Sequence, residues 1–157
     1  MRPAPTVAQL HDALLASPSA TEVLRHLFGG PVLARRLPCD PLALSPLQHF
    51  HLGPTQAEPA CHRRVMLLAA GRAVSEADLW YVPARLAPGM ADALRVTETP
   101  FGDVVRPMAP TRHTLAARIC DPGEPHALEH EAVLRRGDGV AIALVAERYP
   151  AGLHNGA

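Results

Sequence analysis

The chain has 157 residues, 48% of them hydrophobic, and its 15 acidic and 15 basic side chains give a formal net charge of zero. A chain without a basic excess argues against a nucleic acid or an anionic membrane as the main partner. All basic residues other than histidine are arginines, which excludes mechanisms that require a lysine, such as Schiff-base catalysis.

The length predicts one domain covering residues 1–157, large enough to bury roughly two thirds of its unfolded surface. The first residues lack the apolar segment of a signal peptide, and no run approaches the ~18 apolar residues of a membrane span. We therefore expect a soluble, cytoplasmic protein. Cys39, Cys61 and Cys120 are odd in number and widely spaced, which predicts reduced thiols packed as small apolar groups.

Helices are predicted near the N-terminus. Residues 6–17 carry apolar side chains at helical spacing, and residues 19–30 form a stronger helix. There Ser19 and Glu22 match a capping box, and Gly29 ends the apolar stripe. Residues 31–37 are predicted as a strand. The proline-rich segment 38–61 is predicted to be mostly loop, with a short turn of helix.

The rest of the chain predicts strands in pairs. Residues 62–83 are predicted to form an antiparallel hairpin around Gly71, and residues 127–150 a second hairpin around a turn at 136–139. Short helices are predicted over 84–108, followed by a strand at 111–120. Strands joined by short turns favour one antiparallel sheet with helices packed on one side, an α+β fold.

Histidine patterns suggest a metal site only weakly. The segment "HALEH" places His126 and His130 in the H-x-x-E-H order of one class of zinc peptidases. That chemistry needs a helix, whereas this segment runs into a hairpin strand, where the two residues lie ~13 Å apart. His49 and His51 lie among prolines, with no third ligand in view. We expect a polar strand edge and a loop, without metal.

Three features of the sequence could converge on a small anion. Arg63 and Arg64 open an apolar strand, and strand alternation turns one of them inward, as a carboxylate clamp. The helix starts at 19–21 and 99–102 offer free backbone N–H groups. Glu147 follows the apolar run 141–146 and would lie at the other end of the ligand. Alternatively, Arg63 and Glu147 form a surface pair and the helix starts are only structural.

A resemblance favours the ligand site. The segments "RRVMLLAAG", "TPFGDVV" and "GVAIALVAERYP", in this order and at these spacings, resemble the chorismate lyase (chorismate pyruvate-lyase) family and its actinobacterial relatives. The likeness covers roughly residues 17–150. It implies an antiparallel sheet whose helices enclose an internal ligand pocket, and a reaction that needs no cofactor.

The resemblance also implies roles for individual residues. Arg63 and Glu147 would be catalytic: Arg63 would bind the ring carboxylate and Glu147 would face the 4-hydroxyl. Whether Glu147 transfers a proton or only orients the ring is open, as is the choice between Arg63 and Arg64. Four further residues would bind substrate, with backbone groups near Ala20 and Phe101–Gly102 helping to hold the carboxylate: Ala20, Thr21, Phe101 and Gly102.

The expected function is therefore that of a chorismate lyase, which eliminates pyruvate from chorismate to give 4-hydroxybenzoate or a related hydroxybenzoate for quinone or secondary-metabolite synthesis. One alternative is a non-catalytic module that binds a small aromatic acid, because a related fold serves as the effector domain of some transcriptional regulators. Another is a relative that acts on a modified chorismate-like substrate. Each of these has a small-molecule partner and no nucleic-acid or membrane partner.

Overall fold

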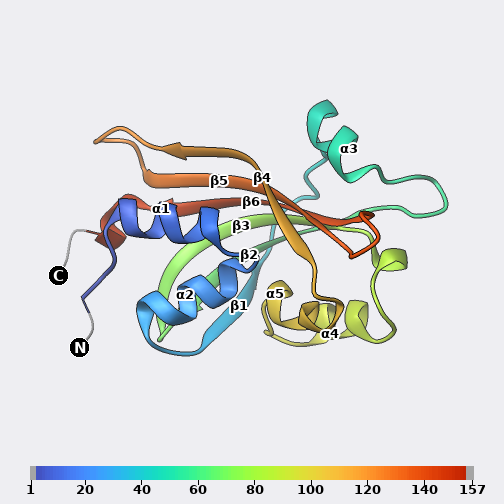
Figure 1. The fold of residues 1–157 in the computed structure, drawn as a ribbon, viewed down its shortest axis with the longest axis horizontal. Helices are drawn as coiled ribbons and strands as arrows, with labels where there is room; N and C mark the ends of the chain where they lie inside the picture. The colour runs from blue at the N-terminus through green and yellow to red at the C-terminus, as the bar shows by residue number, and fades with distance from the viewer. Residues whose placement is uncertain (1–2, 155–157) are drawn as a thin grey trace.

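Six strands form a single antiparallel sheet in the order β1-β2-β3-β6-β5-β4 (Figure 1). The structure is a computed structural model and describes residues 3–154. The strands are β1 Val32–Leu37, β2 Cys61–Ala69, β3 Arg72–Tyr81, β4 Thr111–Ile119, β5 His126–Arg135 and β6 Ala141–Pro150. The predicted antiparallel α+β fold is confirmed. The two hairpins, β2–β3 and β5–β6, meet through β3 and β6 at the middle of the sheet.

The main helices cover one face of this sheet. They are α1 Val7–Ala16, α2 Ala20–Phe28, α4 Met90–Val96 and α5 Phe101–Val104. The short helix α3, Pro46–Leu52, lies on the opposite face, where Leu52 packs with Trp80 and Leu144 (Figure 1). Single 3-10 turns occur at Pro83–Arg85, Arg106–Met108 and Ala151–His154. No helix within residues 3–154 has the length and apolar character to span a membrane.

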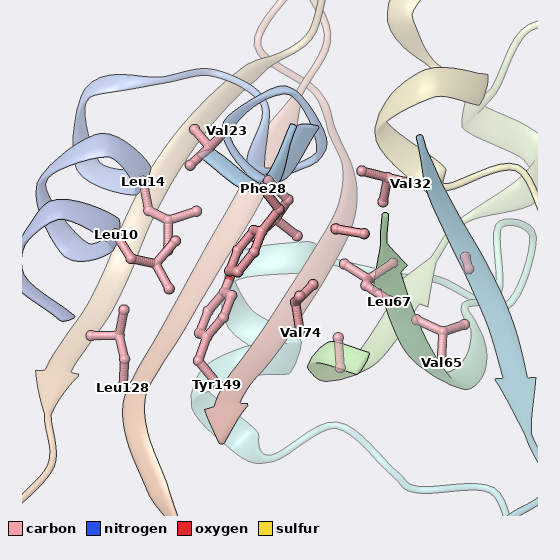
Figure 2. Close-up of a cluster of buried hydrophobic side chains, with 14 residues drawn as sticks. Leu10, Leu14, Val23, Phe28, Val32, Val65, Leu67, Val74, Leu128 and Tyr149 are labelled. Carbon is pink, nitrogen blue, oxygen red and sulfur yellow. The ribbon is translucent and has the colours of Figure 1, made fainter. Parts of the chain in front are cut away.

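The helix-covered face carries two apolar clusters with a space between them. In the first, Leu10 and Leu14 of α1 and Phe28 of α2 pack onto the sheet around Tyr149 (Figure 2). The second lies under α4 and α5, at the other end of the strands. Each large apolar side chain buried in this way contributes about 1.5–3 kcal/mol. Val145 of β6 touches both clusters, so the sheet between them forms the floor of the intervening space.

The start of α2 differs from the prediction. Ser19 caps the helix by accepting a hydrogen bond from the backbone N–H of Glu22 at 3.2 Å, but the reciprocal half of the capping box is absent. The Glu22 carboxylate binds Arg25 at 2.5 Å and also binds Arg106. The pair with Arg106 connects the first turn of α2 to the segment that follows α5. It therefore keeps the N-terminal ends of α2 and α5 next to each other.

Two minor predictions were wrong. Cys39 and Cys61 are exposed and Cys120 is half-buried, so the thiols are not packed in the core. Cys39 follows β1 in a loop and Cys61 is the first residue of β2, so both lie outside the apolar clusters of the core. His49 and His51, expected in a loop, lie on α3, which is the short turn of helix predicted within residues 38–61. Ser45 caps this helix with a capping box, and Pro46 is its first residue.

Candidate functional site

A cavity of 550 Å³ lies between the helices and the sheet. Its floor is formed by β2, β3 and β6, and its walls by the first turn of α2 and by residues 99–102 at the start of α5. The volume is that of a typical small-molecule site. The six residues proposed from the sequence all line it: Ala20, Thr21, Arg63, Phe101, Gly102 and Glu147.

Strand register explains why the floor carries these side chains. Arg63 of β2 pairs with Leu79 of β3, which in turn pairs with Val145 of β6. Two residues further along β6, on the same face, Glu147 pairs with Ala77 of β3. Because side chains alternate across a strand, Arg63 faces the helices and Arg64 faces the other side. There Arg64 binds Asp78, with 3.0 Å between Nε and Oδ1. Arg63, and not Arg64, therefore faces the cavity.

Arg63 brings an uncompensated positive charge to the cavity. It is 8% exposed, and one of its terminal nitrogens donates a hydrogen bond to the carbonyl of Leu94. Its Nε is buried without a partner, and no carboxylate of the described residues lies within ion-pair distance. Burial, and then the nearby charge of Arg36, lower the pKa of Arg63. A buried cation without an acid partner is costly, so the group is suited to a bound anion.

Glu147 lies at the other end of the floor and has a partner that the sequence did not reveal. Arg112 of β4 binds it in a fork, at 2.7 Å from Nη2 to Oε1 and 3.3 Å from Nη1 to Oε2. Both side chains are nearly inaccessible, at 3% and 4% exposed. Burial alone would lower the pKa of Arg112, but the charge and hydrogen bonds of Glu147 raise it. The expected alternative of a surface Arg63–Glu147 pair is therefore wrong.

The helix starts close tightly around the cavity. A Cβ atom at Gly102 would lie 2.7 Å from Thr21 Oγ1 and 3.3 Å from Ser19 Oγ, so only glycine permits this approach of α5 to α2. Phe101 lies at the same helix start, with its ring centroid 6.2 Å from that of Tyr81 on β3. The four proposed binding residues therefore form one continuous wall opposite the sheet.

The "HALEH" segment lies on β5, as predicted for a strand, but it is not the polar strand edge that was expected, because β5 lies between β4 and β6. His130 is buried on the face that carries Glu147, its register partner on β6, and its Nε2 lies 3.0 Å from His11 Nδ1 of α1. His126 is half-buried and close to Glu129. In residues 3–154 no group of three or more potential ligands is arranged to hold a metal ion.

We expect His130 to make the stability of the domain depend on pH. Burial is the main cause that lowers its pKa from 6.5 to about 4, Arg112 and His11 lower it further, and Glu147 opposes them. As the pH falls, His130 therefore takes up a proton near pH 6.5 in the unfolded chain, but only near pH 4 in the folded chain. Stability should be lost across this window, by up to about 3 kcal/mol.

Urea unfolding at several pH values measures this effect. The variant His130→Leu should flatten the curve between pH 6.5 and 4, whereas His113→Leu, at an exposed position on β4, should leave it unchanged. An equal slope in wild type and His130→Leu would show that another group is responsible.

Comparison with known proteins adds a sequence relative. No family model matches the chain. The uncharacterized protein y4mC of Sinorhizobium fredii is 33% identical in an alignment 156 positions long that covers 86% of this chain and 62% of that protein. The chain thus spans less than two thirds of the length of this curated relative.

Solved structures identify the fold. The effector domain of PhnF from Mycobacterium smegmatis superimposes with a TM-score of 0.60 at 18% identity, over 86% of this chain and 90% of that one. The C-terminal domain of the histidine utilization repressor from Pseudomonas syringae gives 0.53 at 14% identity, over 78% and 94%. A GntR-family transcriptional regulator from Bacillus cereus gives 0.51 at 11% identity, over 77% and 92%. The chain has the chorismate lyase-like fold of GntR effector domains.

Proposed function

We propose that this domain binds a small organic carboxylate in the 550 Å³ cavity (the large cavity, since it is the larger of the two that Arg63 lines) and acts as a ligand-binding module without catalysis. The observation that carries this proposal is the buried Arg63, whose charge has no carboxylate partner among the described residues. The structural neighbours, which are effector and regulatory domains, support it at the level of the fold.

The walls indicate the kind of ligand. Apolar side chains of Val65, Leu79, Leu134 and Val145 surround the space between Arg63 and Glu147. These two residues are separated by two strand spacings and two residues along the strand, about 12 Å between Cα atoms. Both side chains rise from the same face of the sheet, so a ligand built on a single ring can place its carboxylate at Arg63 and a polar group at the Arg112–Glu147 pair.

The second candidate is the chorismate pyruvate-lyase expected from the sequence, with Arg63 and Glu147 as catalytic residues. This function remains a candidate because all six residues implied by that resemblance line the cavity. The Arg112–Glu147 ion pair argues against it. Proton transfer to Glu147 would leave Arg112, which is 3% exposed, as a second buried cation without a partner. Glu147 is therefore suited to orient a ligand rather than to exchange protons.

The test is to incubate the pure protein with chorismate and, separately, to titrate it with 4-hydroxybenzoate, benzoate and benzamide by calorimetry. We expect saturable binding of the two carboxylates, much weaker binding of the uncharged amide, and no pyruvate above the uncatalysed rate. Release of pyruvate that is lost in Glu147→Gln would establish the lyase instead. Failure to bind any of the carboxylates would contradict both candidates.

A further inference from the structure

A second, smaller cavity lies on another side of Arg63. It has a volume of 280 Å³, at the end of β1 and the start of β2, and four arginines line it: Arg36, Arg63, Arg64 and Arg95. Tyr81 contributes to the same wall. Arg36, Arg64 and Arg95 do not line the large cavity, so within residues 3–154 Arg63 is the only arginine that lines both.

The sheet and α4 hold Arg36 and Arg63 side by side. Arg36 pairs with Val65 across β1 and β2, which puts it on the same face as Arg63 and diagonally opposite. Both guanidinium groups donate to the carbonyl oxygen of Leu94 in the last turn of α4, that of Arg36 at 3.1 Å. Arg36 also donates to the carbonyl of Arg95 at 3.2 Å.

The charges in this cavity do not balance. Arg64 is paired with Asp78, and Arg95 with Asp92 at 3.1 Å. Arg36 and Arg63 have no carboxylate within ion-pair distance in residues 3–154, and a carbonyl oxygen supplies no full charge. Two adjacent positive charges, one of them more than nine-tenths buried with its Nε unpartnered, therefore remain in the wall of one small cavity.

We propose that this cavity is a second anion site, in which Arg36 and Arg63 together bind a dianionic tetrahedral oxyanion of the phosphate class. Two guanidinium groups present several N–H donors in fixed planes, which match the three oxygens of a phosphoryl group better than the two of a carboxylate. The dianion is either free phosphate or the phosphoryl head of a longer ligand whose body enters the large cavity past Arg63. The site does not require that the large cavity bind a carboxylate.

The experiment is a calorimetric titration of the protein with inorganic phosphate, at constant ionic strength, in the wild type and in two variants with the same loss of charge. Arg36→Gln should weaken phosphate binding at least tenfold. Arg35→Gln is the matched control, because Arg35 is the preceding residue of β1, is exposed and faces the other side of the sheet. It should change the affinity less than twofold. Benzoate binding should be unchanged in Arg36→Gln, which separates this site from the proposed function.

Two further measurements complete the test. In the wild type, phosphate should protect Arg36, but not Arg35, from modification by phenylglyoxal, so the site can be tested even if Arg36→Gln folds poorly. Phenyl phosphate that binds at least tenfold more tightly than phosphate would support the longer ligand, and equal affinities would support the free ion. The absence of saturable phosphate binding, or equal losses in Arg35→Gln and Arg36→Gln, would overturn the proposal.

Discussion

Arg112→Leu is expected to lower the free energy of unfolding by about 3–5 kcal/mol, because it leaves the Glu147 carboxylate buried without its partner. The pair is 3% and 4% exposed, so water cannot replace the guanidinium. Chemical denaturation at pH 7 measures the change. The double variant Arg112→Leu/Glu147→Leu should recover most of the loss, because an apolar pair of similar volume needs no compensating charge.

A surface ion pair provides the control for this experiment. Arg106 binds Glu22 and Asp103 but is 59% exposed, so Arg106→Leu should cost less than about 1 kcal/mol. If Arg112→Leu were as mild as Arg106→Leu, the Arg112–Glu147 pair would have to be open to solvent, and the case against proton transfer by Glu147 would fail.

Arg63→Ala is expected to weaken the binding of benzoate-type ligands by about 2–5 kcal/mol, a loss of about 30-fold to several thousand-fold. The substitution removes the buried cation that would pair with the ligand carboxylate. It should leave the free protein as stable as the wild type or more stable, because that charge has no acid partner in the described part of the chain. Loss of binding without loss of stability is the signature of a group held for a ligand.

Arg64→Ala is the matched control, since Arg64 is the next residue on β2 and faces Asp78 on the other side of the sheet. It should reduce benzoate affinity by less than twofold. Calorimetric titration and thermal unfolding of the two variants test both parts. An effect of Arg64→Ala as large as that of Arg63→Ala would mean that the loss comes from overall charge rather than from the cavity.

Much of the candidate site was predictable because its signals are local. Alternation along β2 required that one of Arg63 and Arg64 face inward, and the apolar run before Glu147 marked a buried strand. Arg112 escaped prediction because "TRHTLAAR" on β4 shows no apolar alternation, and because its partner lies two strands away on β6. Arg36 escaped for a similar reason, since only the cross-strand register sets it beside Arg63.

The sequence by itself determined most of the secondary structure, the antiparallel α+β class and the six residues first proposed to face a ligand. These follow from backbone propensities, turn residues and alternation, which act over a few residues. The tertiary structure decided that β3 pairs with β6, so that Glu147 shares a floor with Arg63, and that Arg112 reaches across β5 to neutralise Glu147. Strand order is set by which apolar faces can be buried together, a property of the whole chain that no short segment encodes.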